Sequence, residues 1–64
     1  MNNFKVKEMQ NILRNNGYAK KRHRGSHEIW YNDDKNDTVV ITNRKKGVNY
    51  FTATKMMKEH CIVR

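Results

Sequence analysis

A hairpin corner is predicted within residues 22–30, which read Arg22-His23-Arg24-Gly25-Ser26-His27-Glu28-Ile29-Trp30. Gly25 tolerates backbone angles that other residues avoid, and Ser26 can hydrogen-bond locally, as turn residues do. The corner therefore joins a basic strand to a returning strand that begins at His27. A histidine at that position is held in place and is still open to solvent.

The segment before this hairpin predicts a helix. Four apolar residues recur at helical spacing and share one arc, namely Val6, Met9, Ile12 and Leu13. We expect the helix to stop at Asn16, because asparagine and the glycine after it tolerate the left-handed conformation that ends helices.

Three strands are predicted in the middle of the chain. The first covers residues 18–24, and its assignment depends mainly on its surroundings because its hydrophobic alternation is weak. Residues 28–31 and 38–42 are richer in strand formers and are separated by the polar turn cluster 32–37. Short connections between three strands imply an antiparallel meander.

A basic loop at residues 43–47 precedes a second predicted helix, for which Thr52 is the expected N-cap. Its apolar face is expected to consist of Ala53, Met56, Met57, His60 and Cys61. We interpret the methionines and Cys61 as core residues, and we place His60 at the edge of the core.

The order of helix, three strands and helix predicts the fold class. Both apolar helix faces need cover, and one face of the sheet can supply it. We therefore expect a two-layer α+β domain over residues 1–64, in which both helices pack on the same side of a three-stranded antiparallel sheet. This α-β-β-β-α arrangement is that of the double-stranded-RNA-binding-domain type of fold.

Alternation along the second strand divides its residues between the two faces of the sheet. His27, Ile29 and Tyr31 point one way, while Glu28 and Trp30 point the other. We place Trp30 against the helices, which leaves the histidine on the solvent face. An open tyrosine on that face is suited to stacking on bases, or to contact with a protein partner.

Charge is the strongest global signal. The 64-residue chain carries fourteen Lys and Arg against six Asp and Glu, a formal net charge of +8 at pH 7. Such a surface favours a polyanionic partner, and nucleic acid is the natural one because each neutralised phosphate releases counterions. A membrane surface is the competing partner, but the basic residues do not follow one amphipathic helix. Simple solubility is a further alternative.

Cysteine content and hydropathy bear on location. A single cysteine excludes an internal disulfide framework and is typical of a reducing compartment. No stretch is apolar enough for a signal peptide or a membrane span, so we expect a cytoplasmic protein. A chain this small has room for one small core, which disfavours chemistry in a deep pocket.

Other readings of the polar residues are weaker. A zinc site formed by His23, His27, His60 and Cys61 lacks the ligand spacing of known zinc motifs, so we expect no metal and no cofactor. Ser26 is interpreted as a turn residue, since no acid and histidine pair accompanies it as in a catalytic triad.

The chain resembles the HicA toxin family. The resemblance is carried by Lys7-Glu8-Met9 to Ile12-Leu13, Gly17-Tyr18, Arg22, Gly25-Ser26-His27, Trp30 and the Thr-led helix from Thr52 to Ile62. It implies an mRNA interferase of bacterial or phage origin with a double-stranded-RNA-binding-like fold. It also implies a HicB-type antitoxin as the partner that neutralises the toxin.

The chemistry of His27 can be considered directly. RNA carries its own nucleophile in the 2′-hydroxyl, so cleavage needs proton transfer and charge stabilisation but no metal. A histidine can supply the proton transfer as general acid or base. Fixed cations can hold the phosphate, and the candidates are Arg22, which matches a family position, Arg24, Lys20, Lys45 and Lys46. Tyr31 is the candidate for base stacking.

Two other function classes stay open at this point. A non-catalytic RNA- or DNA-binding module would use the same charge, with the Gly-Ser-His corner as a structural turn and His27 donating to a nearby carbonyl. A small partner-binding protein would use Ile29 and Tyr31 only to dock another chain. Cleavage products from incubated RNA distinguish a ribonuclease from both.

Overall fold

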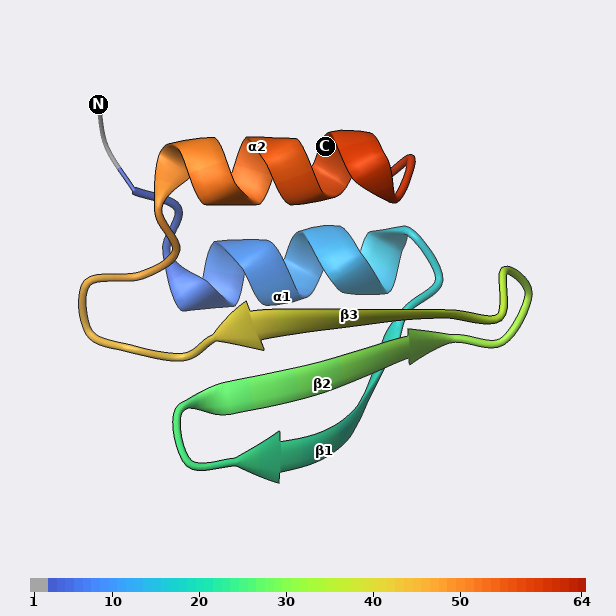
Figure 1. Cartoon of the computed structure of the whole chain (residues 1–64), viewed down its shortest axis with the longest axis horizontal. Helices are drawn as coiled ribbons and strands as arrows, with labels where there is room; N and C mark the ends of the chain where they lie inside the picture. The colour runs from blue at the N-terminus through green and yellow to red at the C-terminus, as the bar shows by residue number, and fades with distance from the viewer. Residues whose placement is uncertain (1–2) are drawn as a thin grey trace.

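The computed structural model describes residues 3–64, and its elements follow the predicted order. The elements are α1 (Val6–Asn15), β1 (Ala19–Arg24), β2 (His27–Asn32), β3 (Asp37–Thr42) and α2 (Tyr50–Glu59). The strands form one antiparallel sheet in the order β1-β2-β3 (Figure 1). The predicted α+β fold is therefore confirmed. A single domain over residues 1–64 stays a prediction, and residues 1–2 lie outside the described part of the chain.

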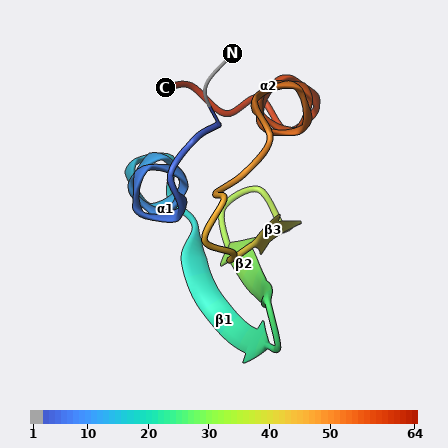
Figure 2. The same ribbon diagram turned by 90° about the vertical axis from the view of Figure 1, so that its left-hand side faces the viewer.

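Both helices lie on one side of the sheet, and the other face carries no helix (Figure 2). Side chains that alternate along β2 and β3 point between the layers and are buried with the apolar faces of the helices. The buried hydrophobic residues are Phe4, Met9, Leu13, Tyr18, Trp30, Val39, Ile41, Val48, Ala53, Met57 and Ile62. Trp30 is 1% exposed, so its predicted position against the helices is confirmed.

Helix α1 ends as its sequence predicts. The Glu8 side chain accepts a hydrogen bond from the backbone N–H of Lys5, 3.4 Å away, at the start of the helix. Asn16 is the C-cap, and Gly17 follows with a φ of 88°. The N–H of Tyr18 then donates to the carbonyl of Leu13 at 2.9 Å, which closes the helix and directs the chain into β1.

Helix α2 begins earlier than predicted. Its N-cap is Asn49, whose side-chain oxygen accepts from the N–H groups of Phe51 and Thr52 at 2.9 and 3.2 Å. The expectation that Thr52 caps the helix is therefore wrong. Tyr50 stacks on Phe4 with ring centroids 5.5 Å apart, and this tertiary contact lies on the first helical turn.

The C-terminal end of α2 also differs from expectation. The helix ends at Glu59, and Cys61 adopts a φ of 55° beyond it, which turns its side chain to solvent. Ile62 enters the core instead, and its N–H donates to the carbonyl of Met57 at 2.8 Å. The interpretation of Cys61 as a core residue is therefore wrong.

A polar cluster connects the end of the sheet near the β2–β3 turn to the residues that follow α1 and α2. The Asp37 carboxylate accepts from the Tyr18 hydroxyl at 2.6 Å and lies 2.7 Å from His60 Nδ1. These hydrogen bonds, first that of Tyr18 and then that of His60, lower the pKa of Asp37. Burial, together with Asp37, raises the pKa of Tyr18 to about 12. His60 is half-buried, as expected for the edge of the core.

Within residues 3–64, no helix has the length and apolar character needed to cross a membrane. A cytoplasmic location stays a prediction.

Candidate active site on the open face of the sheet

His27 is the first residue of β2 and follows a two-residue turn at Gly25 and Ser26. Gly25 has a φ of 57°, which L-residues with a side chain rarely adopt. His27 is exposed and shares the helix-free face with its register partners, Arg24 on β1 and Thr42 on β3. The turn therefore places an open imidazole between a cation and a hydroxyl group.

Strand β1 carries the candidate phosphate-binding residues, and all six of its residues are exposed. Its register with β2 shifts between Lys20 and Arg22, so Lys21 is an extra residue in the ladder. Arg22 lies opposite Ile29 and therefore shares the face of His27. Lys20 lies opposite Trp30, on the helix-facing side. The structure thus groups Arg22 and Arg24 with His27 and separates Lys20 from them.

A shallow hollow of about 410 Å³ lies farther along the open face. It is lined by Lys21, Arg22, Ile29, Tyr31 and Thr38. Both Ile29 and Tyr31 are half-buried. The Lys21 ammonium stands 5.7 Å from the centre of the Tyr31 ring, a cation–π distance. The open face therefore offers an apolar and aromatic surface beside its cations.

The basic loop after β3 lies at the same end of the sheet as the Gly25 turn (Figure 1). The N–H of Asn43 donates to the carbonyl of Ser26 at 2.5 Å, which joins the start of the loop to that turn. Lys45 and Lys46 are exposed, and the carbonyl of Lys46 accepts from the Asn3 side chain at 3.0 Å. The two lysines therefore lie in the loop beyond this end of the sheet, where they line a hollow with the N-terminal segment 3–6.

The residue after His27, Glu28, places a buried carboxylate on the helix-facing side of the sheet. Glu28 is 0% exposed and points between the layers. Both of its oxygens accept from Gln10 of α1 at 2.9 Å, and Oε1 also accepts from the indole N–H of Trp30 at 3.1 Å. Oε2 accepts from the Asn43 side chain at 2.5 Å. Glu28 therefore ties α1 and the start of the basic loop to the strand that carries His27.

The pKa of Glu28 reflects these contacts. Burial by itself raises the pKa of a carboxyl group, and it is the largest single influence on Glu28. The hydrogen bonds of Gln10, Asn43 and Trp30, with the nearby charge of Lys20, together outweigh burial and lower the pKa below its ordinary value. Glu28 is therefore ionised at neutral pH and fully hydrogen-bonded.

A stability prediction follows from this lowered pKa. The ionised carboxylate stabilises the fold above about pH 4.5, the ordinary pKa, and this contribution is lost as the pH falls through the folded-state pKa. In Glu28→Gln, an amide N–H₂ would face side chains that are already donors. We expect a loss of about 1–3 kcal/mol at pH 7 and a weaker dependence on acid.

Urea denaturation of the parent and of Glu28→Gln at pH 7 and in acid measures both effects. The residual acid dependence of the variant reports on groups that it retains, such as Asp37, whose pKa is also lowered. A variant as stable as the parent at pH 7, or one with the same loss of stability in acid, would contradict this role of Glu28.

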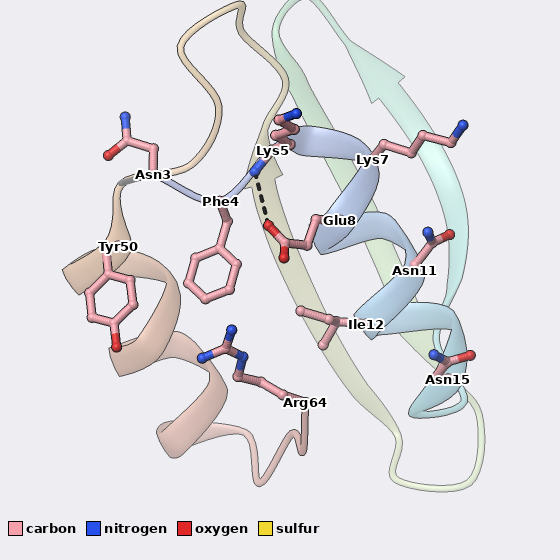
Figure 3. A pocket seen from close by; sticks show the side chains of 10 residues that line it. All are labelled: Asn3, Phe4, Lys5, Lys7, Glu8, Asn11, Ile12, Asn15, Tyr50 and Arg64. Atoms are coloured by element: carbon pink, nitrogen blue, oxygen red, sulfur yellow. Dashed lines mark hydrogen bonds between the residues drawn. The ribbon is translucent and has the colours of Figure 1, made fainter. Parts of the chain in front are cut away.

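A larger hollow lies elsewhere, on the helical side. It measures about 970 Å³ and is bordered by the N-terminal segment, α1, Tyr50 and Arg64 (Figure 3). The Arg64 guanidinium lies 4.8 Å from the centre of the Phe4 ring within it. None of the predicted site residues lines this hollow. The volume of a hollow therefore does not identify the candidate active site in this protein.

The structure gives no support for a metal centre. Within residues 3–64, no three side chains of His, Cys, Asp or Glu are close enough together to hold a metal ion. His23 lies opposite Glu28 in the sheet, whereas His27 lies opposite Arg24, so the two histidines belong to opposite faces. The zinc site considered for His23, His27, His60 and Cys61 is thus not assembled among the described residues.

Three residues of the site were missed by sequence reasoning. Lys21 lies on the open face because of the bulge in β1, and no pattern in the sequence predicts that bulge. Val40 is 53% exposed, and it lies opposite Ile29 on the same face. Glu28 carried a usable signal, because strand alternation groups it with the buried Trp30. An acid beside a core tryptophan predicts a buried carboxylate with hydrogen-bond donors around it.

Residues 6–60 match the family model described as the HicA toxin of bacterial toxin-antitoxin systems. This chain belongs to the HicA toxin family, which assigns it to the toxin side of such a system. Searches of curated proteins and of solved structures give no significant match.

Proposed function

We propose that this protein is an mRNA interferase, a metal-independent endoribonuclease that acts through His27. The observation that carries the proposal is the position of this histidine. It is exposed at the start of β2 on the face without helices, and Arg24 lies opposite it in the sheet. Membership in a toxin family agrees with a destructive activity, and the net charge of +8 agrees with a nucleic-acid substrate.

Cleavage would use the 2′-hydroxyl of the RNA as nucleophile. The 2′-oxygen forms a bond to phosphorus while the bond to the 5′-oxygen breaks, so the products are a 2′,3′-cyclic phosphate and a 5′-hydroxyl. His27 would remove the proton of the 2′-hydroxyl as general base, or protonate the leaving 5′-oxygen as general acid. Water would serve as the other proton carrier.

Cations on the same face would hold the scissile phosphate. Arg22 and Arg24 both lie on the face of His27 and present planar guanidinium groups that bind phosphate oxygens in pairs. Lys45 and Lys46 lie at the same end of the sheet and would hold the continuing backbone. Lys20, on the other side of β1, would contact only RNA that wraps around the edge of the sheet.

The antitoxin would neutralise the toxin by covering this face. A HicB-type partner with acidic groups would pair with the arginines, and its apolar side chains would cover Ile29, Tyr31 and Val40. An exposed Val40 beside Ile29, on the face whose β1 edge is basic, agrees with such a surface, because an apolar patch on a basic face suits a partner that is both acidic and apolar.

Incubation of the purified protein with single-stranded RNA in excess chelator tests the proposed activity. We expect RNA fragments that end in a 2′,3′-cyclic phosphate or its hydrolysed form. A non-catalytic binding module would shift the RNA in a gel and leave it intact, and a chain that only docks proteins would do neither. Intact RNA after long incubation, or cleavage that requires added metal, would contradict the proposal.

A further inference from the structure

We propose that the hollow lined by Lys21, Arg22, Ile29, Tyr31 and Thr38 is a base-specific subsite that selects guanine beside the scissile phosphate. This inference rests on the proposed function, since it takes RNA as the ligand. It adds a sequence preference and assigns a role to Lys21.

The bulge in β1 is the structural origin of the subsite. In a regular ladder, counting back from the pair of Arg22 with Ile29, Lys21 would lie opposite Trp30 and face the helices. The extra residue instead brings Lys20 opposite Trp30 and leaves Lys21 beside Arg22 on the open face. Bulges commonly redirect a side chain next to a functional site. Two consecutive cations therefore border one hollow.

The floor and wall of the hollow are suited to a flat ring. Ile29 and Tyr31 supply apolar and aromatic surface, and both are only half-buried. The Tyr31 hydroxyl donates to the side-chain oxygen of Asn36, so the ring is held at its outer end. A base that stacks here meets a ring that is already held in position, and it takes the place over the ring that the Lys21 ammonium occupies in its absence, 5.7 Å from the ring centre.

The polar groups of the hollow favour one kind of base edge. Lys21 and Arg22 are donors only, and the Thr38 hydroxyl can donate or accept. Guanine presents two neighbouring acceptors, O6 and N7, which lysine recognises. Lys21 takes this role, while Arg22 keeps its contact with the phosphate. Adenine presents an amino group at the corresponding position, and that donor would face the cations. The donor set therefore selects guanine over adenine.

The distance along β2 places this base next to the cleavage point. Ile29 is two residues from His27 on the same face, or about 7 Å at the usual rise of a strand, and Tyr31 is about 13 Å away. The base in the hollow therefore belongs to a nucleotide that neighbours the scissile phosphate. Arg22 lies opposite Ile29, which is midway along β2 between His27 and Tyr31.

The test measures binding with the His27→Ala protein, which should bind RNA while cutting it about 10²–10⁴-fold more slowly than the parent. The probes are oligouridylates that carry one central guanosine, one central adenosine or neither, compared by fluorescence anisotropy at one salt concentration. We expect the guanosine oligomer to bind about tenfold more tightly than the adenosine oligomer. Equal affinities for the three oligomers would overturn the proposal.

Lys21→Ala and Lys20→Ala, each in the same background, form a matched pair. Both remove one exposed lysine from β1, but only Lys21 lies on the open face, so Lys20→Ala controls for the loss of one positive charge from the strand. Only Lys21→Ala should abolish the preference for guanosine. If Lys20→Ala abolishes it equally, or if neither variant does, Lys21 does not read the base. A hollow that serves a protein partner instead would leave the two variants alike.

The design separates this inference from the proposed function. If the parent protein leaves RNA intact while the guanosine preference depends on Lys21, the subsite stands and the ribonuclease proposal fails. If the parent cuts RNA with no preference at neighbouring positions and the oligomers bind equally, the subsite fails and the ribonuclease stands.

Discussion

RNA cleavage by His27→Ala is expected to be about 10²–10⁴-fold slower than cleavage by the parent protein, the usual contribution of a positioned general acid or base. His27 is exposed, and within residues 3–64 its side chain makes no hydrogen bond, so its removal should change the free energy of unfolding by less than about 0.5 kcal/mol. Initial cleavage rates and urea denaturation, measured on the same preparations, separate catalysis from folding.

His23→Ala is the matched control for this prediction. His23 is also exposed and lies on the same hairpin, and its substitution removes the same imidazole group. Its register partner, however, is Glu28, whose side chain lies on the other side of the sheet. We expect His23→Ala to cut RNA at nearly the parental rate. Equal losses in the two variants, or a parental rate in His27→Ala, would mean that His27 is not the catalyst.

Gly47→Ala is expected to have the largest effect on stability. Gly47 has a φ of 78°, and a Cβ at this position would lie 2.2 Å from the carbonyl oxygen of Phe4. That carbonyl accepts from the N–H of Val48 at 2.7 Å, and the N–H of Phe4 donates back to Val48 at 2.9 Å. Relief of the clash must therefore break a backbone bridge and withdraw Phe4 and Val48 from the core.

The size of this loss can be compared with the whole stability of the chain. A protein of this length has a free energy of unfolding of about 3–10 kcal/mol. Backbone strain alone costs about 1–3 kcal/mol, and the broken bridge adds to it. We expect Gly47→Ala to lose at least about 3 kcal/mol, enough to unfold a substantial part of the population at 37 °C.

Gly25→Ala provides the control for Gly47→Ala. Its φ of 57° is also in the left-handed region, but within residues 3–64 no heavy atom beyond its chain neighbours lies within 4 Å of the added Cβ. This variant should lose only the conformational cost, about 1–2 kcal/mol. Urea denaturation of both variants measures the difference. Similar losses at the two positions would show that the contact with Phe4 yields easily and does not limit substitution.

Much of the fold could be predicted because its elements have regular periods. The apolar spacing from Val6 to Leu13 identifies α1, and alternation from Glu28 to Trp30 assigns the faces of β2 correctly. The ends of α2 could not be predicted this way. Its start is capped by Asn49, and because asparagine and threonine are both common N-cap residues, the pattern does not choose between Asn49 and Thr52. The stacking of Tyr50 on Phe4, a contact between residues far apart in the sequence, lies on the turn that was missed.

The candidate site divides in the same manner. His27 and Arg24 follow from the hairpin corner, because a two-residue turn makes its flanking residues partners. The sequence does not predict which of Lys20 and Lys21 lies on the open face. A bulge displaces every residue before it by one position and so exchanges the two faces of the sheet. The two adjacent lysines look equivalent in the sequence, but their side chains lie on opposite faces of the sheet.

The central claim is that RNA lies on the face of the sheet without helices. The most direct measurement is an NMR titration of His27→Ala with a short single-stranded RNA, observed through side-chain signals that report on separate surfaces. We predict that the Tyr31 ring signals shift, while the side-chain amides of Asn11 and Asn15, which border the hollow between the helices, do not. Shifts confined to Asn11 and Asn15, with Tyr31 unchanged, would contradict the account.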